Sequence, residues 1–452
     1  MSRLFGTDGV RGVANTELSP LLAFNLGYCG AKVLAEPAGP RPRILVGHDS
    51  RISAGMLQAA LVAGITSSGA DVYLADVIPT PGVAYLTRTQ GFDAGVMISA
   101  SHNSFEFNGI KFFNKQGFKL ADIVEDEIER MIKADSRDPR QEKIGEDLGR
   151  VFDYSKGQNI YLQYLKDSLG LDLKGTKIAI DCANGAASYL APSLFRELGA
   201  EIVVIANQPN GLNINDGCGS THLDKLCQIT REEKCDIGFA FDGDADRMLA
   251  VDAQGRPVDG DKIMVIIASQ LKASQRLPQD TLVVTVMSNL GLHRAAEKLD
   301  LKIACTKVGD RYVLEEMQTK GYGFGGEQSG HMILLELATT GDGLLSALAL
   351  LQALEFHGED LEEMESIMHV YPQVLVPAFI PNENKTKAMA DPEIMALIEE
   401  VDRSMGDEGR VLVRPSGTEP QIRVMIEGDD HDVIDAEAKR IAAYIVEKYG
   451  DK

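Results

Sequence analysis

Several features that would point to other classes of protein are missing from this chain of 452 residues. Its six cysteines are scattered without a CxxC pair, so neither a disulfide framework nor a zinc site is indicated. Cys182 and Cys305 each belong to an apolar run, and we expect both to be small residues of the core. This cysteine usage favours a reducing cytoplasm.

A membrane anchor is not indicated either. A membrane-spanning helix needs about 18 consecutive apolar residues, and the apolar run at 263–268 is far shorter. The amino terminus, Met1 to Gly6, has no apolar signal core. We therefore expect no membrane partner and a cytoplasmic location.

Positive charge is scarce as well. The chain has 45 Lys and Arg residues against 67 Asp and Glu residues, a formal net charge of −22. Binding to a phosphate backbone needs a basic face, so this balance argues against a nucleic-acid partner. It does not exclude a small anionic substrate, because salt screens charges beyond about 8 Å and a few arginines in a cleft can outweigh a distant acidic surface.

The chain has the composition of a soluble globular protein, and its length predicts roughly three or four domains. The order strand, polar loop, helix, strand recurs three times. The expected strands of these three units are 43–47 and 70–74, 177–181 and 201–205, and 282–286 and 301–305. We predict three related α/β domains, each with a polar loop at the carboxyl end of a strand; the alternative is chance recurrence.

The remaining pattern predicts the domain boundaries. Residues 134–150 are polar and charged, which is typical of a linker. Beyond Pro372 the pattern changes to strand, helix (391–405), strand, strand, helix (432–448), which indicates a smaller C-terminal α+β domain. The predicted fold is three related α/β/α domains plus this α+β domain, with boundaries at 1–150, 151–255, 256–370 and 371–452.

Three aspartates at alternate positions are the clearest metal-binding pattern. Asp242, Asp244 and Asp246 follow an apolar strand, and on an extended chain their side chains share one face. Gly243 would let the backbone curl so that the carboxylates converge. Such hard oxygen ligands suit Mg²⁺, whereas a calcium EF-hand loop fails because Arg247 stands at its glycine position. Arg247 is then placed to contact a phosphate.

Ser101 is the candidate nucleophile. It follows the apolar run 94–98, at the exit of a predicted strand, where α/β folds place their chemistry. Adjacent side chains on a strand point apart, so a Ser-His dyad with His102 is not expected; His102 would orient the loop or contact phosphate. The alternative is a plain Ser/Asn-rich turn.

Two further loops carry polar groups. The segment 414–423 (RPSGTEPQIR) offers a glycine-containing turn, two hydroxyls and two guanidiniums, the elements of a phosphate clamp; the alternative is a hairpin turn with surface arginines. The segment 325–331 (GGEQSGH) could bring polar groups close to a polyol, or it could be a glycine-rich turn with His331 in the core. Together with Ser101 and the aspartates, these loops indicate phosphoryl transfer on a phosphosugar.

Five motifs in this order resemble the α-D-phosphohexomutase superfamily along the whole chain. They are FGTDGVRG at 5–12, SASHN at 99–103, DGDADR at 242–247, GEQSGH at 326–331 and RPSGT at 414–418. The resemblance implies four domains with one loop each around a central cleft, and a phosphate carried by Ser101. The form of the fourth motif and the segment 308–313 favour the branch that acts on glucosamine phosphates.

The resemblance also implies roles for individual residues. The phosphate on Ser101, with Asp242, Asp244 and Asp246, would hold one Mg²⁺. Lys111 would transfer protons, unless it is a solvated surface lysine, and Arg11, Arg247 and His102 complete the implied catalytic set. The residues implied for substrate binding are Glu327 and Ser329 for the sugar hydroxyls and Arg414, Ser416, Gly417, Thr418 and Arg423 for the phosphate that does not react.

The implied reaction interconverts glucosamine 6-phosphate and glucosamine 1-phosphate through a hexosamine 1,6-bisphosphate. Mannose or glucose phosphates, a phosphatase and an inactive sugar-phosphate sensor are the alternatives, and a homodimer is a family-level expectation. Two departures from the family pattern stand out. Ser104 and Phe107 replace a proline and a polar residue, so we expect a more mobile loop. Val308-Gly309-Asp310 stands where other branches place a histidine, so the second proton-transfer group is unassigned.

Overall fold

The structure, a computed structural model, describes residues 3–6, 8–34, 41–134, 142–416 and 419–450. Within these residues the strands form four sheets. The chain divides into two compact units. The first runs to Met287 and includes Leu299–Ile367, and the second comprises Ser288–Lys298 and the chain from Met368. Each unit is described separately below.

The first sheet is mixed, with the strand order β1-β5-β4-β2-β3-β6. Its strands β2, β3, β4 and β6 are parallel, and β5 runs antiparallel between β1 and β4. The bounds are β1 Val10–Val13, β2 Arg43–His48, β3 Asp71–Val77, β4 Ala94–Ile98, β5 Phe107–Asn114 and β6 Val151–Asp153. Because β6 pairs with β3, this sheet continues to residue 153.

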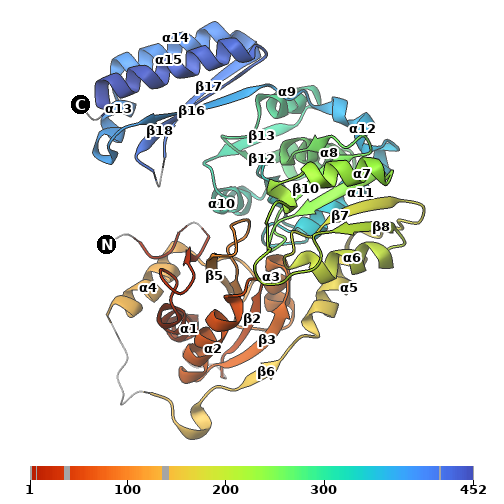
Figure 1. Cartoon of the computed structure of the whole chain (residues 1–452), viewed down its shortest axis with the longest axis vertical. Helices are drawn as coiled ribbons and strands as arrows, with labels where there is room; N and C mark the ends of the chain where they lie inside the picture. Colours follow the sequence, from red (N-terminus) through yellow and green to blue (C-terminus); the bar gives the residue numbers. More distant parts are fainter. Residues whose placement is uncertain (1–2, 7, 35–40, 135–141, 417–418, 451–452) are drawn as a thin grey trace. The chain divides into compact units, whose positions relative to one another are not determined.

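Helices cover both faces of the first sheet (Figure 1). On one face, Leu26, Leu61 and Ile128 from α1, α2 and α4 belong to one buried cluster with Val46 and Val96 of the sheet. On the other face α3 packs against β2 and β4 and also contacts α5. The bounds are α1 Pro20–Leu34, α2 Ala54–Ser67, α3 Thr80–Thr89, α4 Asp122–Lys133 and α5 Gly157–Leu169.

The second sheet has the order β11-β10-β9-β7-β8, and the third has the order β13-β12-β14-β15. The strands of the second sheet and the helices between them are β7 Lys177–Asp181, α6 Ala187–Glu197, β8 Glu201–Ile205, α7 Asp224–Glu232, β9 Ile237–Phe241, β10 Met248–Asp252 and β11 Pro257–Val258. The strands of the third sheet and the helices of the same part of the chain are α8 Gly260–Ala273, β12 Thr281–Thr285, β13 Lys302–Thr306, α10 Asp310–Lys320, β14 Phe324–Gly326, β15 Met332–Leu334, α11 Gly343–His357 and α12 Leu361–Met364.

The recurring unit predicted from the sequence is present in all three sheets. The pairs β2/β3, β7/β8 and β12/β13 are each parallel. Parallel neighbours need a crossover connection, and α2, α6 and α9 (Leu290–Lys298) supply it.

The second unit contains a three-stranded antiparallel sheet of order β16-β18-β17. Ile422, Val424 and Ile426 of β18 share a buried core with Ile441 and Ile445 of α15. The predicted C-terminal strand and helix pattern is therefore confirmed. The bounds are β16 Gln373–Phe379, α13 Lys385–Met389, α14 Pro392–Met405, β17 Gly409–Pro415, β18 Gln421–Gly428 and α15 His431–Tyr449.

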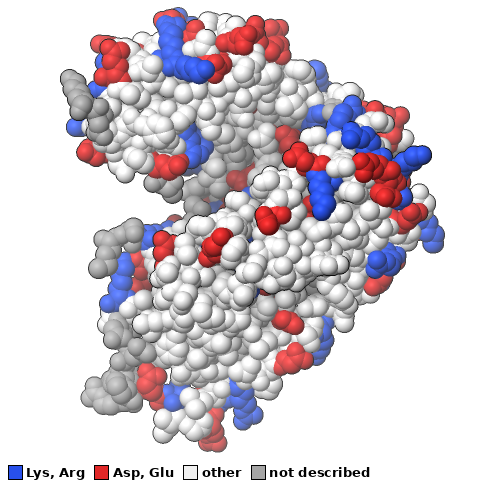
Figure 2. Space-filling view, viewed as in Figure 1, with Lys and Arg blue, Asp and Glu red and all other residues white. Residues whose placement is uncertain are grey.

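The predicted fold class, three α/β/α domains and a smaller α+β domain, is confirmed; the domain boundaries and the central cleft stay predictions. Cys182 is buried as expected, but Cys305 is exposed, because β13 is an edge strand. In the described part of the chain, no helix is long and apolar enough to cross a membrane. On the face drawn in Figure 2, acidic and basic side chains are interspersed over the described surface.

Candidate active site

Ser101 lies in the turn between β4 and β5, three residues beyond the fully buried strand β4. Its side chain is buried, and its Oγ donates a hydrogen bond of 2.6 Å to Oδ2 of Asp242. Its φ is +53°, a left-handed conformation that costs a non-glycine residue free energy unless its surroundings hold it. The Ser101 amide donates to Oγ of Ser99 at 3.0 Å, which is one such contact.

The side chain of Arg51 holds the carbonyl groups of this turn. It is buried and donates to the carbonyl oxygens of Ser101 and Asn103 at 2.8 Å, and to those of Ser104 and Phe107. Five donors in a rigid fork suit such a contact. We expected greater mobility of this loop because Ser104 replaces a proline. The hydrogen bonds from Arg51, a residue outside all five motifs, oppose that mobility.

Two more residues take part in this hydrogen-bond network around the Ser101 turn. Asp49 is buried and accepts from Nε of Arg51 at 2.8 Å and from Oγ of Ser99 at 2.6 Å. Asn215, from the segment between β8 and α7, donates to the Ser101 carbonyl at 2.9 Å. Asp49 and Arg51 lie in the polar loop that follows the strand at 43–47. The position of this loop at the end of a strand was the one sequence feature that could have indicated their role.

The three aspartates lie in the loop that joins β9 to β10. All three are buried, and one oxygen of each lies within 4.8 Å of the others. Their convergence was expected, but the cause differs, because they occupy a turn rather than an extended strand. Ala245 has the positive φ, +55°, whereas Gly243 is required by close approach: a Cβ there would lie 2.5 Å from the Ser101 carbonyl oxygen.

The aspartate cluster fits a divalent cation. Oδ1 of Asp244 and Oδ1 of Asp246 are buried and accept no hydrogen bond from any described residue. Burial and the two neighbouring carboxylates raise the pKa of Asp242 well above its usual value. A bound cation would satisfy the two oxygens and offset this repulsion, and hard oxygen donors with room for further ligands suit Mg²⁺.

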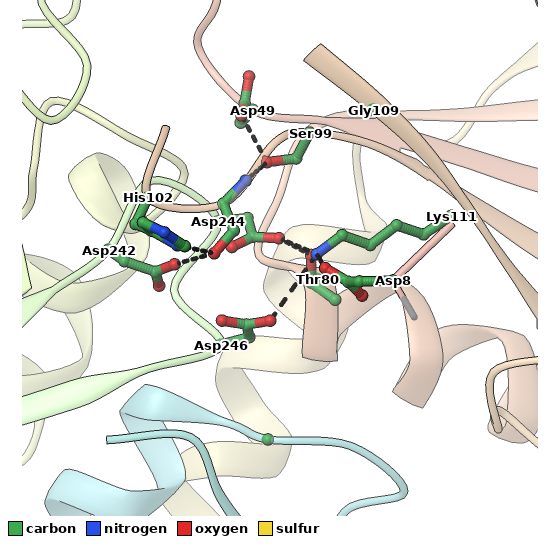
Figure 3. Close-up of polar contacts among 12 residues, drawn as sticks. Asp8, Asp49, Thr80, Ser99, His102, Gly109, Lys111, Asp242, Asp244 and Asp246 are labelled. Carbon is green, nitrogen blue, oxygen red and sulfur yellow. Dashed lines mark hydrogen bonds and ion pairs between the residues drawn. The ribbon is translucent and has the colours of Figure 1, made fainter. Parts of the chain in front are cut away.

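Lys111 of β5 is buried among carboxylates, so the alternative of a solvated surface lysine is wrong. Its Nζ lies 2.8 Å from Oδ2 of Asp244, 3.0 Å from Oδ2 of Asp8 and 3.8 Å from Oδ2 of Asp246 (Figure 3). Burial alone would lower the pKa of Lys111, but Asp244 and Asp8 raise it above its usual value. Without ligands, Lys111 is therefore an ammonium.

A second buried lysine, absent from the sequence predictions, lies close by. Lys119 forms ion pairs with both Asp8 and Asp310, residues 302 positions apart in the chain. His331 places Nδ1 3.5 Å from Asp246 and Nε2 3.6 Å from Asp310. The ring of His331 is buried, as expected if this residue belongs to the core, but its neighbours are charged.

His102 is next to Ser101, and the positive charges of Arg11 and Arg247 act on its ring. Nδ1 of His102 lies 3.4 Å from Oγ of Ser101, and the left-handed turn at Ser101 makes this contact possible. The expectation that the two side chains point apart was based on a strand, and Ser101 is not in one. Burial, Arg247 and Arg11 lower the pKa of His102 to about 4, so its imidazole is neutral at neutral pH.

Glu327 and Ser329 occupy the loop between β14 and β15. This loop adjoins the aspartate loop, because the amide of Met248 donates to the Gly330 carbonyl at 3.1 Å. Oγ of Ser329 is buried and has no hydrogen-bond partner among the described residues. Burial raises the pKa of Glu327, whose Oε1 accepts from the Gly309 amide at 3.1 Å. Both side chains retain capacity to bind hydroxyl groups.

The predicted phosphate clamp lies in the second unit, at the turn between β17 and β18. Arg414 and Arg423 are direct partners across these two strands. Ser416 is buried, and Nζ of Lys385 donates to its carbonyl oxygen at 2.7 Å. Gly417 and Thr418 lie outside the described residues. Like charges on directly opposite residues of a sheet are unfavourable, and Glu419 offsets part of this repulsion through an ion pair of 2.7 Å with Arg423.

Comparison with known proteins gives the family. Models of the phosphoglucomutase/phosphomannomutase family match its α/β/α domains I, II and III at residues 2–138, 159–255 and 259–371, and its C-terminal domain at 380–445. The phosphoglucosamine mutase of Caldicellulosiruptor bescii is 55% identical over 448 residues, 98% of this chain and 99% of that protein.

Solved structures have the same fold. A phosphoglucomutase/phosphomannomutase family protein from Burkholderia thailandensis superposes with a TM-score of 0.78 at 20% identity, covering 99% of this chain and 98% of that one. The Aspergillus fumigatus N-acetylphosphoglucosamine mutase, in complex with GlcNAc-6P and magnesium, has a TM-score of 0.67 at 17% identity over 99% and 96% of the chains. The chain belongs to the phosphohexomutase family, whose members are enzymes of the isomerase type.

Proposed function

We propose that this protein interconverts glucosamine 6-phosphate and glucosamine 1-phosphate through a phosphate on Ser101 and a hexosamine 1,6-bisphosphate intermediate. The contact between Oγ of Ser101 and Asp242, inside a buried group of three aspartates, carries the proposal. A hydroxyl beside a cation site is what a phosphate carrier needs, whereas a protein that only binds a sugar phosphate needs no nucleophile. The name of the 55% identical relative supports glucosamine as the sugar.

The proposed reaction has two half-reactions. In the first, O1 of the 6-phosphosugar attacks phosphorus, the bond from phosphorus to Oγ of Ser101 breaks, and a bisphosphate forms. The bisphosphate then turns over, and its other phosphoryl group returns to Ser101. In each half-reaction the attacking hydroxyl loses one proton and the departing oxygen gains one. Lys111, an ammonium beside the aspartates, would donate a proton to the departing oxygen and then accept the proton that the attacking hydroxyl loses. A second proton-transfer group stays unassigned.

Asp242, Asp244 and Asp246, with a phosphate oxygen on Ser101, would hold one Mg²⁺. When bound, the ion supplies positive charge next to the transferring phosphoryl group. The side chains of Arg11 and Arg247 would add positive charge near Ser101, and the neutral imidazole of His102 would orient the loop or contact the phosphate.

Substrate binding is assigned to the two remaining loops. Glu327 and Ser329 would bind sugar hydroxyls with the carboxylate and the unpartnered hydroxyl described above. The phosphate that does not react would be held by Arg414, Ser416, Gly417, Thr418 and Arg423. A phosphate placed between the two arginines would offset their repulsion.

Ser101→Ala is the decisive variant. We expect turnover to fall by several orders of magnitude while the fold is retained, because the phosphate carrier is lost. Intact-mass measurement should find one phosphate, about 80 Da, on the wild-type protein and none on the variant. An active Ser101→Ala variant would overturn the proposal, and phosphate release in excess of isomerisation would indicate a phosphatase instead.

Mannose or glucose phosphates are the second candidate substrates, since the same residues would catalyse the same chemistry on them. Comparison of kcat/KM for the three sugars separates these alternatives. We expect the glucosamine phosphates to give the highest value, and a preference for mannose of about a hundredfold, or about 2.7 kcal/mol, would contradict the assignment.

The cellular setting is also a proposal. We infer a cytoplasmic enzyme that supplies amino-sugar nucleotide and cell-wall precursor synthesis, with a phosphosugar as its partner and without nucleic acid or membrane partners. A homodimer is the expected assembly, and analytical ultracentrifugation of the purified chain would test it.

A further inference from the structure

Thr80 contacts a metal-binding candidate although no motif contains it. It is the first residue of α3, is fully buried and lies 164 positions from Asp244 in the chain. Its Oγ1 donates a hydrogen bond of 2.6 Å to Oδ2 of Asp244, and its amide donates one of 3.0 Å to the Asp244 carbonyl oxygen (Figure 3). One residue of the first sheet's domain thus holds both the backbone and the side chain of Asp244.

The two carboxylate oxygens of Asp244 have different surroundings. Oδ2 accepts from Oγ1 of Thr80 and from Nζ of Lys111. Oδ1 is buried and accepts no hydrogen bond from the described residues. A carboxylate is planar, so two donors that fix Oδ2 also restrict rotation of the group and the position of Oδ1.

We propose that Thr80 is a positioning residue for the divalent cation: its hydroxyl holds Asp244 so that Oδ1 stays available as a ligand. This inference rests on the proposed metal site. A ligand that is already held loses less freedom when the cation binds, and outer partners of metal ligands typically contribute about 10- to 100-fold in affinity. The hydroxyl of Thr80 should therefore affect metal affinity more than it affects the chemical step.

The same helix offers a matched control. Thr87 is also fully buried in α3, and its Oγ1 donates to the Val83 carbonyl oxygen at 2.7 Å. Thr80→Val and Thr87→Val each remove one buried hydroxyl and keep the shape of the side chain. Only the first removes a donor from Asp244, so a loss common to both variants reports on packing.

The test is calorimetric titration of MgCl₂ into wild-type protein, Thr80→Val, Thr80→Ser and Thr87→Val, with intact masses recorded so that variants are compared at equal phosphorylation. We expect the Mg²⁺ Kd to rise about 10- to 100-fold in Thr80→Val. Thr80→Ser keeps the hydroxyl and should restore the affinity, and Thr87→Val should match the wild type. Activity of Thr80→Val should recover at high Mg²⁺, because the chemical groups are intact.

Two outcomes would overturn the inference in different ways. If the wild type binds Mg²⁺ and Thr80→Val binds it equally well, the positioning role is wrong and the metal site stands. If the wild type does not bind Mg²⁺, the metal site itself is wrong, and the role of Thr80 with it. Thr80→Ala provides the same comparison if the valine variant does not fold.

Discussion

The proposed catalytic cluster of the first unit and the proposed phosphate clamp of the second differ in how deeply their charges are buried and in the balance of the two signs. In the cluster, buried charges of both signs lie together: Lys111 contacts three carboxylates, whereas burial and two neighbouring carboxylates raise the pKa of Asp242. Burial would raise the pKa of Asp8, but Lys111, Lys119 and Arg11 hold it well below its usual value. In the proposed clamp, Arg414 and Arg423 are partners across two strands, and burial and Arg423 lower the pKa of Arg414. Arg423 also forms an ion pair of 2.7 Å with the exposed Glu419.

This difference indicates what each region does. Paired charges in a buried cluster keep each group fixed while charge moves between atoms, and fixed groups need no reorganisation at the moment of reaction. Like charges on opposite strands are unfavourable, and an anionic ligand would offset the part of this repulsion that the Glu419 carboxylate leaves. We infer that the cluster is built for catalysis and the clamp for binding, so substitutions in the two regions should separate kcat from KM.

The largest effect after loss of Ser101 should come from Lys111→Met. We expect kcat to fall about 10²- to 10⁴-fold, the usual contribution of a positioned proton-transfer group. Lys119→Met is the matched control, since Lys119 is also a buried lysine with two carboxylate partners but forms no ion pair with Asp244. Both variants should lose thermal stability. Equal loss of kcat in the two would mean that Lys111 acts only through the packing of charges.

A smaller effect, on binding, should follow Arg414→Gln. We expect KM for the phosphosugar to rise about 10- to 100-fold, the equivalent of one or two charge-assisted hydrogen bonds. Stability should change little, because removal of the repulsion from Arg423 offsets the contacts that Arg414 loses. Steady-state kinetics and thermal unfolding measure the two quantities on the same preparation.

Arg410 is the control for that experiment. It lies on the same strand, but its guanidinium is 2.7 Å from the fully buried carboxylate of Glu427. Arg410→Gln leaves this charge unpaired, so stability should fall by about 3 to 5 kcal/mol with little change in KM. If Arg414→Gln behaves like Arg410→Gln, the proposed division between catalysis and binding is wrong.

The sequence was sufficient for the elements and for the loops that carry chemistry. Apolar runs that end in polar residues identify the strands before Ser101 and Asp242, and short motifs keep residues such as Asp244 and Asp246 together. These patterns involve residues that are close together in the sequence, so they can be recognised without knowledge of the fold. The close approach at Gly243 was missed, because its reason is the carbonyl of Ser101, more than a hundred residues away.

What the sequence could not supply are contacts between distant segments. Thr80 appears in the sequence as an ordinary helix start, and Lys119 as one of many lysines. Arg51 bonds four carbonyl groups that belong to a loop about 50 residues away. Every residue has a backbone carbonyl group, so a hydrogen bond to that group does not restrict which side chain the partner carries. Such a contact therefore produces no recognisable pattern in the sequence. Edge position, which exposes Cys305, is likewise a property of the sheet.

The smallest and most specific effect concerns a carboxyl group without a cation in hydrogen-bond contact. Asp342 is the N-cap of α11 and accepts hydrogen bonds from Tyr161 at 2.7 Å and from the Leu345 amide at 3.0 Å. Burial raises its pKa from 3.8 to about 6, the opposite of the shift at Asp8. The native state therefore binds a proton more tightly than the unfolded state, and the stability contributed by Asp342 is lost as pH rises from about 4 through 6.

Asp342→Asn does not titrate and isolates this contribution. From pH 4.5 to pH 7.5 the wild type should lose stability relative to the variant, by about 2 kcal/mol for a shift of this size. Unfolding of both proteins at several pH values measures the difference directly, and other titrating groups cancel in the comparison. A difference that is constant, or that grows in favour of the wild type as pH rises, would show that Asp342 is ionised in the native protein. Its environment would then resemble that of the paired carboxylates of the cluster.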